Sequence, residues 1–365
     1  MKPMHRPPLA EVLAALLPDS QDTLLLRACL GNAASAAGAW RAWLSEAGGL
    51  PKALTDRPAC RGLMPLLHHS LRSNRIAVTE SELAILRAAS LWEQSRAAEI
   101  RSILRQVMTA LGEAGIRPIT IAGVAVAAAA YPAFELRHCH DIALLVEKTA
   151  LVRARDTLAA SGVAFAGKAA AGQETSSINL WHKGGLPVVL QSALWAPTGT
   201  PDQAAELRRR IVAAELDDST LRVFNPADML LHACGQSIEP TEPGNWEWAI
   251  DAAMILDRYG RAGLNWAALV VTAKNGGIAF RLSLRLDYLA RCLSLPVPAF
   301  VTDELAAAAW RGGRSEWERS LSLTRGSFGV PLVTMLRQGG WPSKLAVAGW
   351  ALRRSPRLLG MRALP

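Results

Sequence analysis

The sequence predicts an α+β protein in which a mixed β-sheet core lies between helical N- and C-terminal blocks. Apolar residues recur at helical spacing as far as Gly115 and return to that spacing after Pro226, whereas the part between them contains short apolar runs of strand length. Residues 121–146 add a compact succession of strand, alanine-rich helix and second strand. We therefore expect about four to five strands within residues 116–195, with helices on both sides.

Three helices are expected in the N-terminal block, where Ala, Leu, Arg and Glu dominate. Their ranges are 9–17, 24–43 and 80–111. Thr79 precedes the last range and Glu82 follows three residues later, which is the spacing of a capping box. This pair predicts that the third helix begins directly after Thr79.

The core is expected to contain short strands and helices in alternation. The predicted strand ranges are 117–122, 142–146, 163–166, 178–182 and 188–194. Lys183, Gly184 and Gly185 predict a hairpin turn between the last two strands. Residues 150–160 have the pattern of a helix that follows the second strand.

Helix starts in the C-terminal part are predicted by asparagines, which are good N-caps: Asn225, Asn245 and Asn265. The helix after Asn245 is expected to end at Gly260, and the helix after Asn265 at residues 275–277. These patterns divide the chain into a helical N-terminal block (1–115), an α/β core (116–224), a helical C-terminal domain (225–320) and a basic tail (321–365).

The positive charge of the chain is concentrated at its C-terminal end. The formal net charge is +9, and no Asp or Glu follows Glu318. Such a tail could contact nucleic acid, an anionic membrane surface or an acidic partner, or it could be a solvated basic surface. Trp341 and Trp350 give part of the tail some amphipathic character, which keeps contact with an anionic surface among the expectations.

The cysteines and the apolar runs predict a reduced, cytoplasmic protein without a transmembrane segment. No pair of cysteines has the spacing of a zinc knuckle, and their number is odd: Cys29, Cys60, Cys139, Cys234 and Cys292. No charge-free apolar run reaches the roughly 18–20 residues that a membrane helix needs.

Chemistry is concentrated in residues 121–146. A glycine directly after a strand, here Gly123, lets phosphate approach the backbone and the start of the following helix. Asp141 stands at the beginning of the second strand, and carboxylate oxygens are the ligands that Mg²⁺ prefers. A strand supplies two such ligands economically when they are two residues apart, because alternate residues face the same side.

With these motifs the chain, from about residue 10 to 300, resembles the uncharacterised nucleotidyltransferase family of the polymerase-β-like superfamily. The resemblance rests on five segments: Ile121-Ala122-Gly123-Val124, Tyr131-Pro132, Arg137, Asp141–Val146 and Trp246–Asp251. Residues 265–296 resemble the closing helical pair of the family. The resemblance implies a nucleotidyltransferase-like fold, an NTP and Mg²⁺ as substrate and cofactor, and transfer of NMP to an unknown acceptor.

The chain departs from the family pattern at four chemical positions. The resemblance places a lysine where Ala122 stands, a second metal carboxylate where Ala143 stands, a third acid at Val189 and a histidine at Gln191. Of the three expected metal carboxylates, Asp141 remains. One carboxylate cannot hold two Mg²⁺ ions in octahedral geometry without further ligands.

The surviving nucleotide-binding candidates are Gly123, Val124 and Arg137. Arg137 is the basic residue expected to contact the triphosphate, although a salt bridge to Asp141 or a bond to a carbonyl is an equally good interpretation. Asp251 is expected to have a structural role through hydrogen bonds from its helix.

Several side chains could compensate for the missing ligands. Glu135 or Glu147 could replace a carboxylate, and the succession His138-Cys139-His140 with Asp141 could bind a softer ion such as Zn²⁺. Adjacent strand residues point to opposite faces, so at most two of the four would converge.

Two hypotheses of function follow. The first is an enzyme that moves NMP from an NTP to an unknown acceptor, with activity weakened or lost because two metal carboxylates are absent. The second is a protein that binds a nucleotide or a partner without turnover, as a scaffold or regulatory subunit of a biosynthetic pathway.

Overall fold

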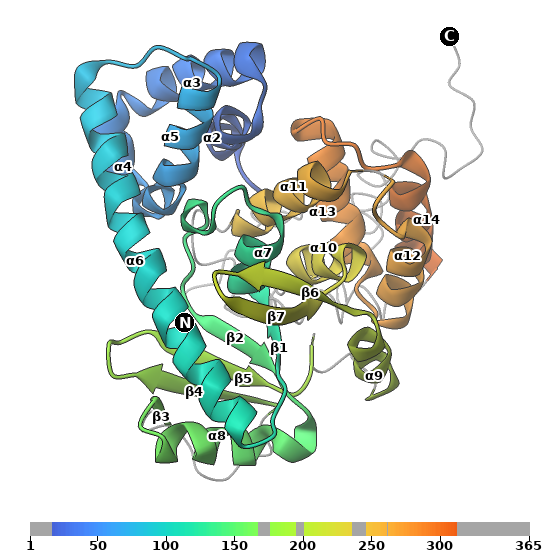
Figure 1. Cartoon of the computed structure of the whole chain (residues 1–365). Coiled ribbons are helices and arrows are strands. Elements are labelled where there is room, and N and C mark those ends of the chain that lie inside the picture. Colours follow the sequence, from blue (N-terminus) through green and yellow to red (C-terminus); the bar gives the residue numbers. More distant parts are fainter. Residues whose placement is uncertain (1–16, 167–175, 195–200, 236–245, 261, 312–365) are drawn as a thin grey trace, which may run out of the picture.

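The computed structural model describes residues 17–166, 176–194, 201–235, 246–260 and 262–311 (Figure 1). The predicted helix 9–17, apart from its last residue, lies outside the described residues. The predicted N-cap at Asn245 and the basic tail 321–365 also lie outside them.

The N-terminal block consists of helices followed by one long helix that runs down to the sheet (Figure 1). Its elements are α2 (Ser20–Leu30), α3 (Ala33–Ala47), α4 (Leu50–Asp56), η1 (Pro58–Leu63), α5 (Met64–Ser73) and α6 (Glu80–Glu113). The prediction of a single helix over 24–43 was wrong. Gly31 leaves the helical region, and the Asn32 side chain accepts a hydrogen bond from the backbone N–H of Ser35, which starts a new helix.

The long helix α6 begins as its capping box predicts. The Thr79 side chain accepts a bond from the backbone N–H of Glu82, and the Glu82 carboxylate accepts one from the backbone N–H of Thr79. The helix packs against α5, η2 (Phe134–Leu136) and α8 (Leu151–Ala160), and so connects the N-terminal block to the core.

The core is a mixed five-stranded sheet, as the sequence predicts. Its strands lie in the order β1-β2-β5-β4-β3. They are β1 (Ile119–Ile121), β2 (Ile142–Leu145), β3 (Ala164–Ala166), β4 (Ser177–His182) and β5 (Pro187–Gln191). β2 and β5 run parallel, and the other neighbours run antiparallel. The helix α7 (Ala122–Ala130) packs against β1 and β2, and α8, preceded by η3 (Lys148–Ala150), packs against β3, β4 and β5.

A hairpin that the sequence did not predict follows the sheet. The helix α9 (Pro201–Arg209) leads into β6 (Ile211–Leu216) and β7 (Ser219–Phe224), which pair with each other, and β7 lies beside β1. The turn contains Asp217 with φ of 51°, a left-handed conformation that Asp tolerates better than most residues. Without a glycine, this turn lacks the strongest hairpin signal.

The C-terminal helices confirm two of the predicted asparagine caps. They are α10 (Pro226–Gly235), α11 (Glu247–Tyr259), α12 (Trp266–Asn275), α13 (Ala279–Cys292) and α14 (Ala299–Arg311). The Asn225 side chain accepts bonds from the first turn of α10, and Asn265 caps α12. Gly260 ends α11 with φ of 64°. Among the described residues, no helix is both long enough and apolar enough to cross a membrane.

Candidate functional site

A small polar cavity lies where α7 begins and β2 begins. We call it the Asp141 pocket, and its volume is about 210 Å³. Its lining comes from α7, the segment before β2 and the C-terminal helices: Ala122, Gly123, Arg137, His140, Asp141, Ala233, Glu247, Trp248, Asp251 and Arg285. The cavity thus brings together three residues of the segment 121–146: Gly123, Arg137 and Asp141.

The sheet places the expected metal positions side by side. Asp141 directly precedes β2, and Ala143 on β2 pairs in parallel register with Val189 on β5. Neither Ala143 nor Val189 lines the Asp141 pocket, although the resemblance places metal carboxylates at both positions. Gln191 lies two residues further along β5, opposite Leu145. Neither β2 nor β5 contains an Asp or Glu, so Asp141, directly before β2, is the carboxylate that remains at the expected metal position.

The entry to α7 brings backbone close to the pocket. Ala122, the first residue of α7, has φ of 57°, which turns the chain sharply from β1 into the helix. A Cβ atom on Gly123 would lie 3.3 Å from Nη2 of Arg137, so glycine allows the guanidinium to pack against the first turn. Val124, which was expected to bind nucleotide, is 1% exposed and does not line the Asp141 pocket.

Arg137 is held by carboxylates of α11. Its Nε and Nη2 atoms donate to the two carboxylate oxygens of Asp251 at 2.8 and 3.0 Å, and Nη2 also donates to Glu247 at 3.1 Å. Tyr131 donates to Asp251 at 2.8 Å, and His140 Nε2 lies 2.6 Å from Glu247. We call these five residues the Arg137 cluster. Arg137 also donates to the carbonyl of His138, so its partners are a carbonyl, as expected, and α11 rather than Asp141.

The carboxylates of the pocket have opposite electrostatic character. Burial raises the pKa of Asp141 above its usual value, and the charges of His140 and Arg137 compensate only in part. Burial would also raise the pKa of Glu247, but the charge of Arg137 and the hydrogen bond with His140 lower it to about 2. The same hydrogen bond raises the pKa of His140. The negative charge on α11 is therefore stabilised by its partners, whereas the charge on Asp141 is disfavoured.

Of the alternative ligands considered from the sequence, His140 lines the Asp141 pocket, whereas Glu135 and Glu147 do not. Glu147 pairs with Arg208 at 3.1 Å, and Glu135 lines a different cavity beside α5. Cys139 is buried, and burial raises the pKa of its thiol to about 12. In the described part of the chain, no group of three or more His, Cys, Asp and Glu side chains is arranged to hold a metal ion. The Zn²⁺ interpretation is therefore not supported there.

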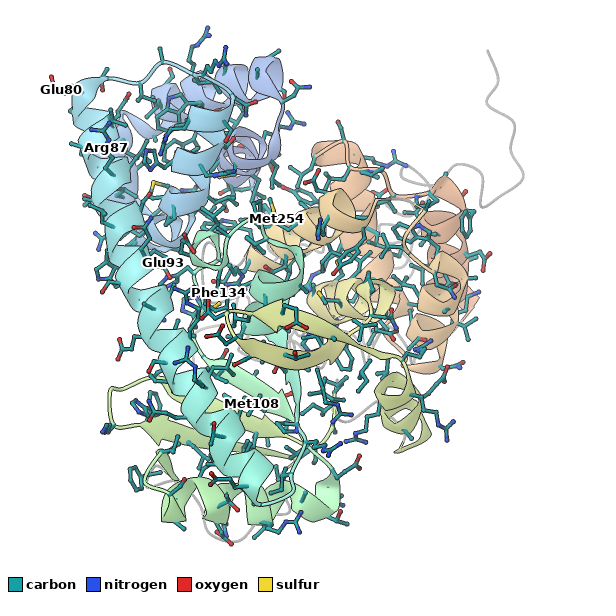
Figure 2. The ribbon with its side chains drawn as sticks, viewed as in Figure 1. Glu80, Arg87, Glu93, Met108, Phe134 and Met254 are labelled. Atoms are coloured by element: carbon teal, nitrogen blue, oxygen red, sulfur yellow. The ribbon has the colours of Figure 1, made fainter. Side chains whose placement is uncertain are left out.

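A second histidine–carboxylate pair lies next to the Arg137 cluster. His138 Nδ1 lies 2.6 Å from a carboxylate oxygen of Glu93, a residue of α6 that is 1% exposed. Figure 2 shows Glu93 midway along α6, near the segment that carries Phe134. The His138 ring meets the His140 ring edge-on at 4.7 Å. The segment 137–140 is thus fixed from two sides, by α6 and by α11.

A larger cavity adjoins the Asp141 pocket. We call it the N-terminal cleft, and its volume is about 670 Å³. The N-terminal helices form one wall, through residues such as Leu54, Ala59, Met64 and Trp92. Tyr131, Leu136, Trp246 and Ile250 form the opposite wall. Arg137, His140 and Glu247 line both cavities, so the two meet at the Arg137 cluster.

Two of the residues that build this site were missed by sequence reasoning. Glu247 stands four residues before Asp251, and this spacing places both on one face of a helix, which is a signal that could have revealed it. Glu93 is one of several acidic residues on α6, and nothing in its local sequence distinguishes it.

A mixed sheet with a tight strand-to-helix entry and a carboxylate at the start of the next strand is the arrangement expected of a nucleotidyltransferase. A family model described as an uncharacterised nucleotidyltransferase matches residues 52–294, which is more than half of the 365 residues. The chain belongs to this family. The matched range begins within α4 and ends just beyond α13, so it includes the sheet and both cavities. No match was found among curated protein sequences.

Proposed function

We propose that this protein binds a nucleoside triphosphate at the Asp141 pocket but does not carry out nucleotidyl transfer by the two-metal route. It would then act as a nucleotide-dependent scaffold or regulatory protein of a biosynthetic pathway. The observation that carries the proposal is the register of β2 and β5, in which Ala143 and Val189 lie side by side where the resemblance calls for carboxylates.

The chemistry explains why this register matters. In nucleotidyl transfer, two divalent cations neutralise the leaving pyrophosphate and activate the attacking oxygen. Mg²⁺ needs several oxygen ligands in octahedral geometry, and alanine and valine side chains have none. The residues present therefore do not fit a pair of Mg²⁺ ions, and we derive no catalytic step through them.

Glu247 and Asp251 are poor substitutes as metal ligands. Both carboxylates accept hydrogen bonds from Arg137, and Glu247 accepts a further bond from His140. A cation that recruited them would have to compete with a buried guanidinium for the same oxygens. Breaking a buried ion pair leaves an uncompensated charge, and that costs several kcal/mol.

Nucleotide binding is supported by what remains at the start of α7. The backbone N–H groups in the first turn of a helix have no partners within the helix, and they favour anions. Ala122 and Gly123 line the Asp141 pocket, and because alanine has only a methyl group and glycine has no side chain, a phosphate could approach this turn. Asp141 could then hold one Mg²⁺ against the phosphate oxygens.

The proposal is tested by binding and turnover on the same samples. Calorimetry with each of the four common NTPs, with Mg²⁺ or Mn²⁺, should show binding that weakens in Asp141→Ala. Pyrophosphate release should stay at background for the wild type. Robust release by the wild type that disappears in Asp141→Ala would overturn the proposal and restore the family activity, NMP transfer from an NTP to an acceptor.

A restored variant sharpens this test. Ala143→Asp combined with Val189→Asp should strengthen Mg²⁺-dependent NTP binding, because oxygen ligands return to both strands. The matched control is Ala143→Asn with Val189→Asn, which has a similar shape but lacks the negative charge. Melting temperatures with and without Mg²⁺ separate metal binding from mutual repulsion of the new carboxylates. Equal NTP binding by the two double variants would show that these positions are not metal positions.

A further inference from the structure

The N-terminal cleft has the properties of a site for a small organic ligand. Its volume of about 670 Å³ is in the range of small-molecule sites, roughly 300–1,000 Å³. Most of its lining is apolar, and its charged or imidazole side chains are few: Arg61, Arg137, His138, His140 and Glu247. Tyr131, Trp92 and Trp246 add a hydroxyl and two indole N–H groups. Such cavities bury the apolar body of a ligand and orient it through a small number of polar contacts.

The apolar wall offers surface for a ring. Trp92 lines the cleft and is 60% exposed, an unusual exposure for the largest apolar side chain. Met64 also lines the cleft but is fully buried, so Trp92 is the residue that offers the ring surface. The position of Trp92 is fixed, because its ring stacks on His138 with the centroids 5.8 Å apart.

At its polar end, beside the Arg137 cluster, the cleft offers the Glu247 carboxylate as an acceptor, and the cation Arg61 lines the cleft from η1. Nε and both Nη atoms of Arg137 already donate to Asp251, Glu247 and the His138 carbonyl. Each oxygen of Glu247 accepts one hydrogen bond from the described residues, Oε1 from His140 and Oε2 from Arg137, and a carboxylate oxygen can accept two. A ligand group at this end therefore meets a carboxylate with unused acceptor capacity.

We propose that the N-terminal cleft binds a small molecule with an apolar, ring-bearing body and a hydroxyl or amine that donates to Glu247. The Asp141 pocket begins at the same residues, so the donor group of this ligand would lie beside the nucleotide phosphates. This inference goes beyond nucleotide binding. It rests on the proposed function only in assuming that the Asp141 pocket holds a nucleotide.

The test uses four indole compounds that share one ring, measured by calorimetry in buffer without nucleotide. All four carry the indole N–H and differ in the group at C3: tryptamine and tryptophol have a side-chain donor, 3-methylindole has no polar group there, and indole-3-acetate has a carboxylate. The two donors should bind about tenfold more tightly than 3-methylindole, because a hydrogen bond to a charged group contributes that much. Indole-3-acetate should bind more weakly than tryptamine, since its carboxylate has no donor for Glu247 and is repelled by it.

Two variants locate the binding. Ala59 is exposed and lines the cleft, so Ala59→Trp should fill the cleft without disturbing the core and weaken tryptamine binding about tenfold or more. Ala98→Trp is the matched control, because Ala98 is an exposed residue of α6 that does not line the cleft. Glu247→Gln should remove most of the preference of tryptamine over 3-methylindole. Circular dichroism and melting temperature establish that each variant is folded.

Several results would overturn the inference. These are no binding of any indole up to its solubility, unchanged binding in Ala59→Trp, or tighter binding of the carboxylate than of the amine. Because no nucleotide is present, these outcomes are independent of the NTP experiments. Failure of NTP binding with successful indole binding would leave the cleft as a ligand site and reject only the proposed nucleotide.

Discussion

The start of β2 and the first turns of α11 contribute carboxylates to the same cavity, but these carboxylates differ in what surrounds them. Glu247 and Asp251 on α11 are tied to a buried arginine at 2.8 to 3.1 Å. Asp141 is half-buried, its side chain makes no hydrogen bond to a described residue, and its partial burial raises its pKa. The three carboxylates line the same cavity, but only Glu247 and Asp251 have a charged hydrogen-bond partner that compensates their charge.

This difference separates two purposes of a buried charge. A carboxylate whose charge is compensated by the protein stabilises the fold, and a metal ion would have to displace its partners to bind it. A carboxylate whose charge is disfavoured gains from any cation that reaches it, which is the condition of a ligand-binding group. The predictions below test this contrast, from the largest expected effect to the smallest.

Removing the arginine should have the largest effect. Arg137→Met leaves Asp251 and Glu247 without their buried partner, and the free energy of unfolding should fall by about 3–5 kcal/mol. The control is Arg155→Met, because Arg155 pairs with Asp156 on the surface and such pairs contribute about 0–1 kcal/mol. Urea denaturation followed by circular dichroism measures both. A loss as small as that of the control would contradict a stabilising role for the Arg137 cluster.

Titration should separate the two kinds of carboxylate. The pKa of Glu247 is lowered from 4.5 to about 2, so its stabilising contribution is complete above about pH 4.5 and is lost as the pH falls toward 2. Glu247→Gln should therefore be less stable than the wild type at pH 7, and the difference should shrink below pH 4.5. This variant keeps the size of the side chain and removes its charge.

Asp141 should show the opposite sign. Its pKa is raised above 3.8, so its ionised form costs stability at neutral pH, and the cost disappears as the pH falls through its folded pKa. Asp141→Asn should therefore be more stable than the wild type at pH 7 and equal to it near pH 3. Denaturant titrations at pH 7 and pH 3 measure both variants, and a destabilised Asp141→Asn at pH 7 would remove the contrast.

The smallest effect is expected at the entry to α7. Ala122 has φ of 57°, a conformation that costs a non-glycine residue about 1–2 kcal/mol. Ala122→Gly should raise the free energy of unfolding by up to about 1 kcal/mol, because the greater entropy of unfolded glycine offsets part of the gain. Ala125→Gly, in the same helix, should instead lower it by about 1 kcal/mol. Thermal denaturation compares the two, and equal effects would exclude strain at Ala122.

Local signals were sufficient to predict most of the fold. Each strand of the sheet is a short apolar run bounded by turn residues, and Asn225, Asn265 and Thr79 cap their helices through contacts within three residues. Local sequence signals gave a wrong or missing prediction in two places, the break between α2 and α3 and the β6–β7 hairpin. Ala-rich spacing continues across the break between α2 and α3, and the turn between β6 and β7 has no glycine.

The candidate site was predictable only where it is contiguous in sequence. Gly123, Arg137 and Asp141 lie on one segment, and the structure brings them to one cavity. The partners that determine the state of Arg137 come from 110 and 114 residues away. Whether an arginine is available to a ligand depends on such distant partners, and no local pattern of a single sequence encodes them.

The helix α6 has a mechanical consequence for the N-terminal cleft. It is one continuous helix of 34 residues, about 50 Å long, with no proline and with its single glycine one residue from its end. Trp92 in one half lines the cleft, while Arg101 in the other half reaches Asp217 in the β6–β7 turn at 3.2 Å. Because such a rod does not hinge, the cleft would widen through movement of the other elements that line it, such as α4, η1, α5, η2 or α11. Any ligand-driven tilt of α6 itself would displace the sheet and the β6–β7 hairpin together.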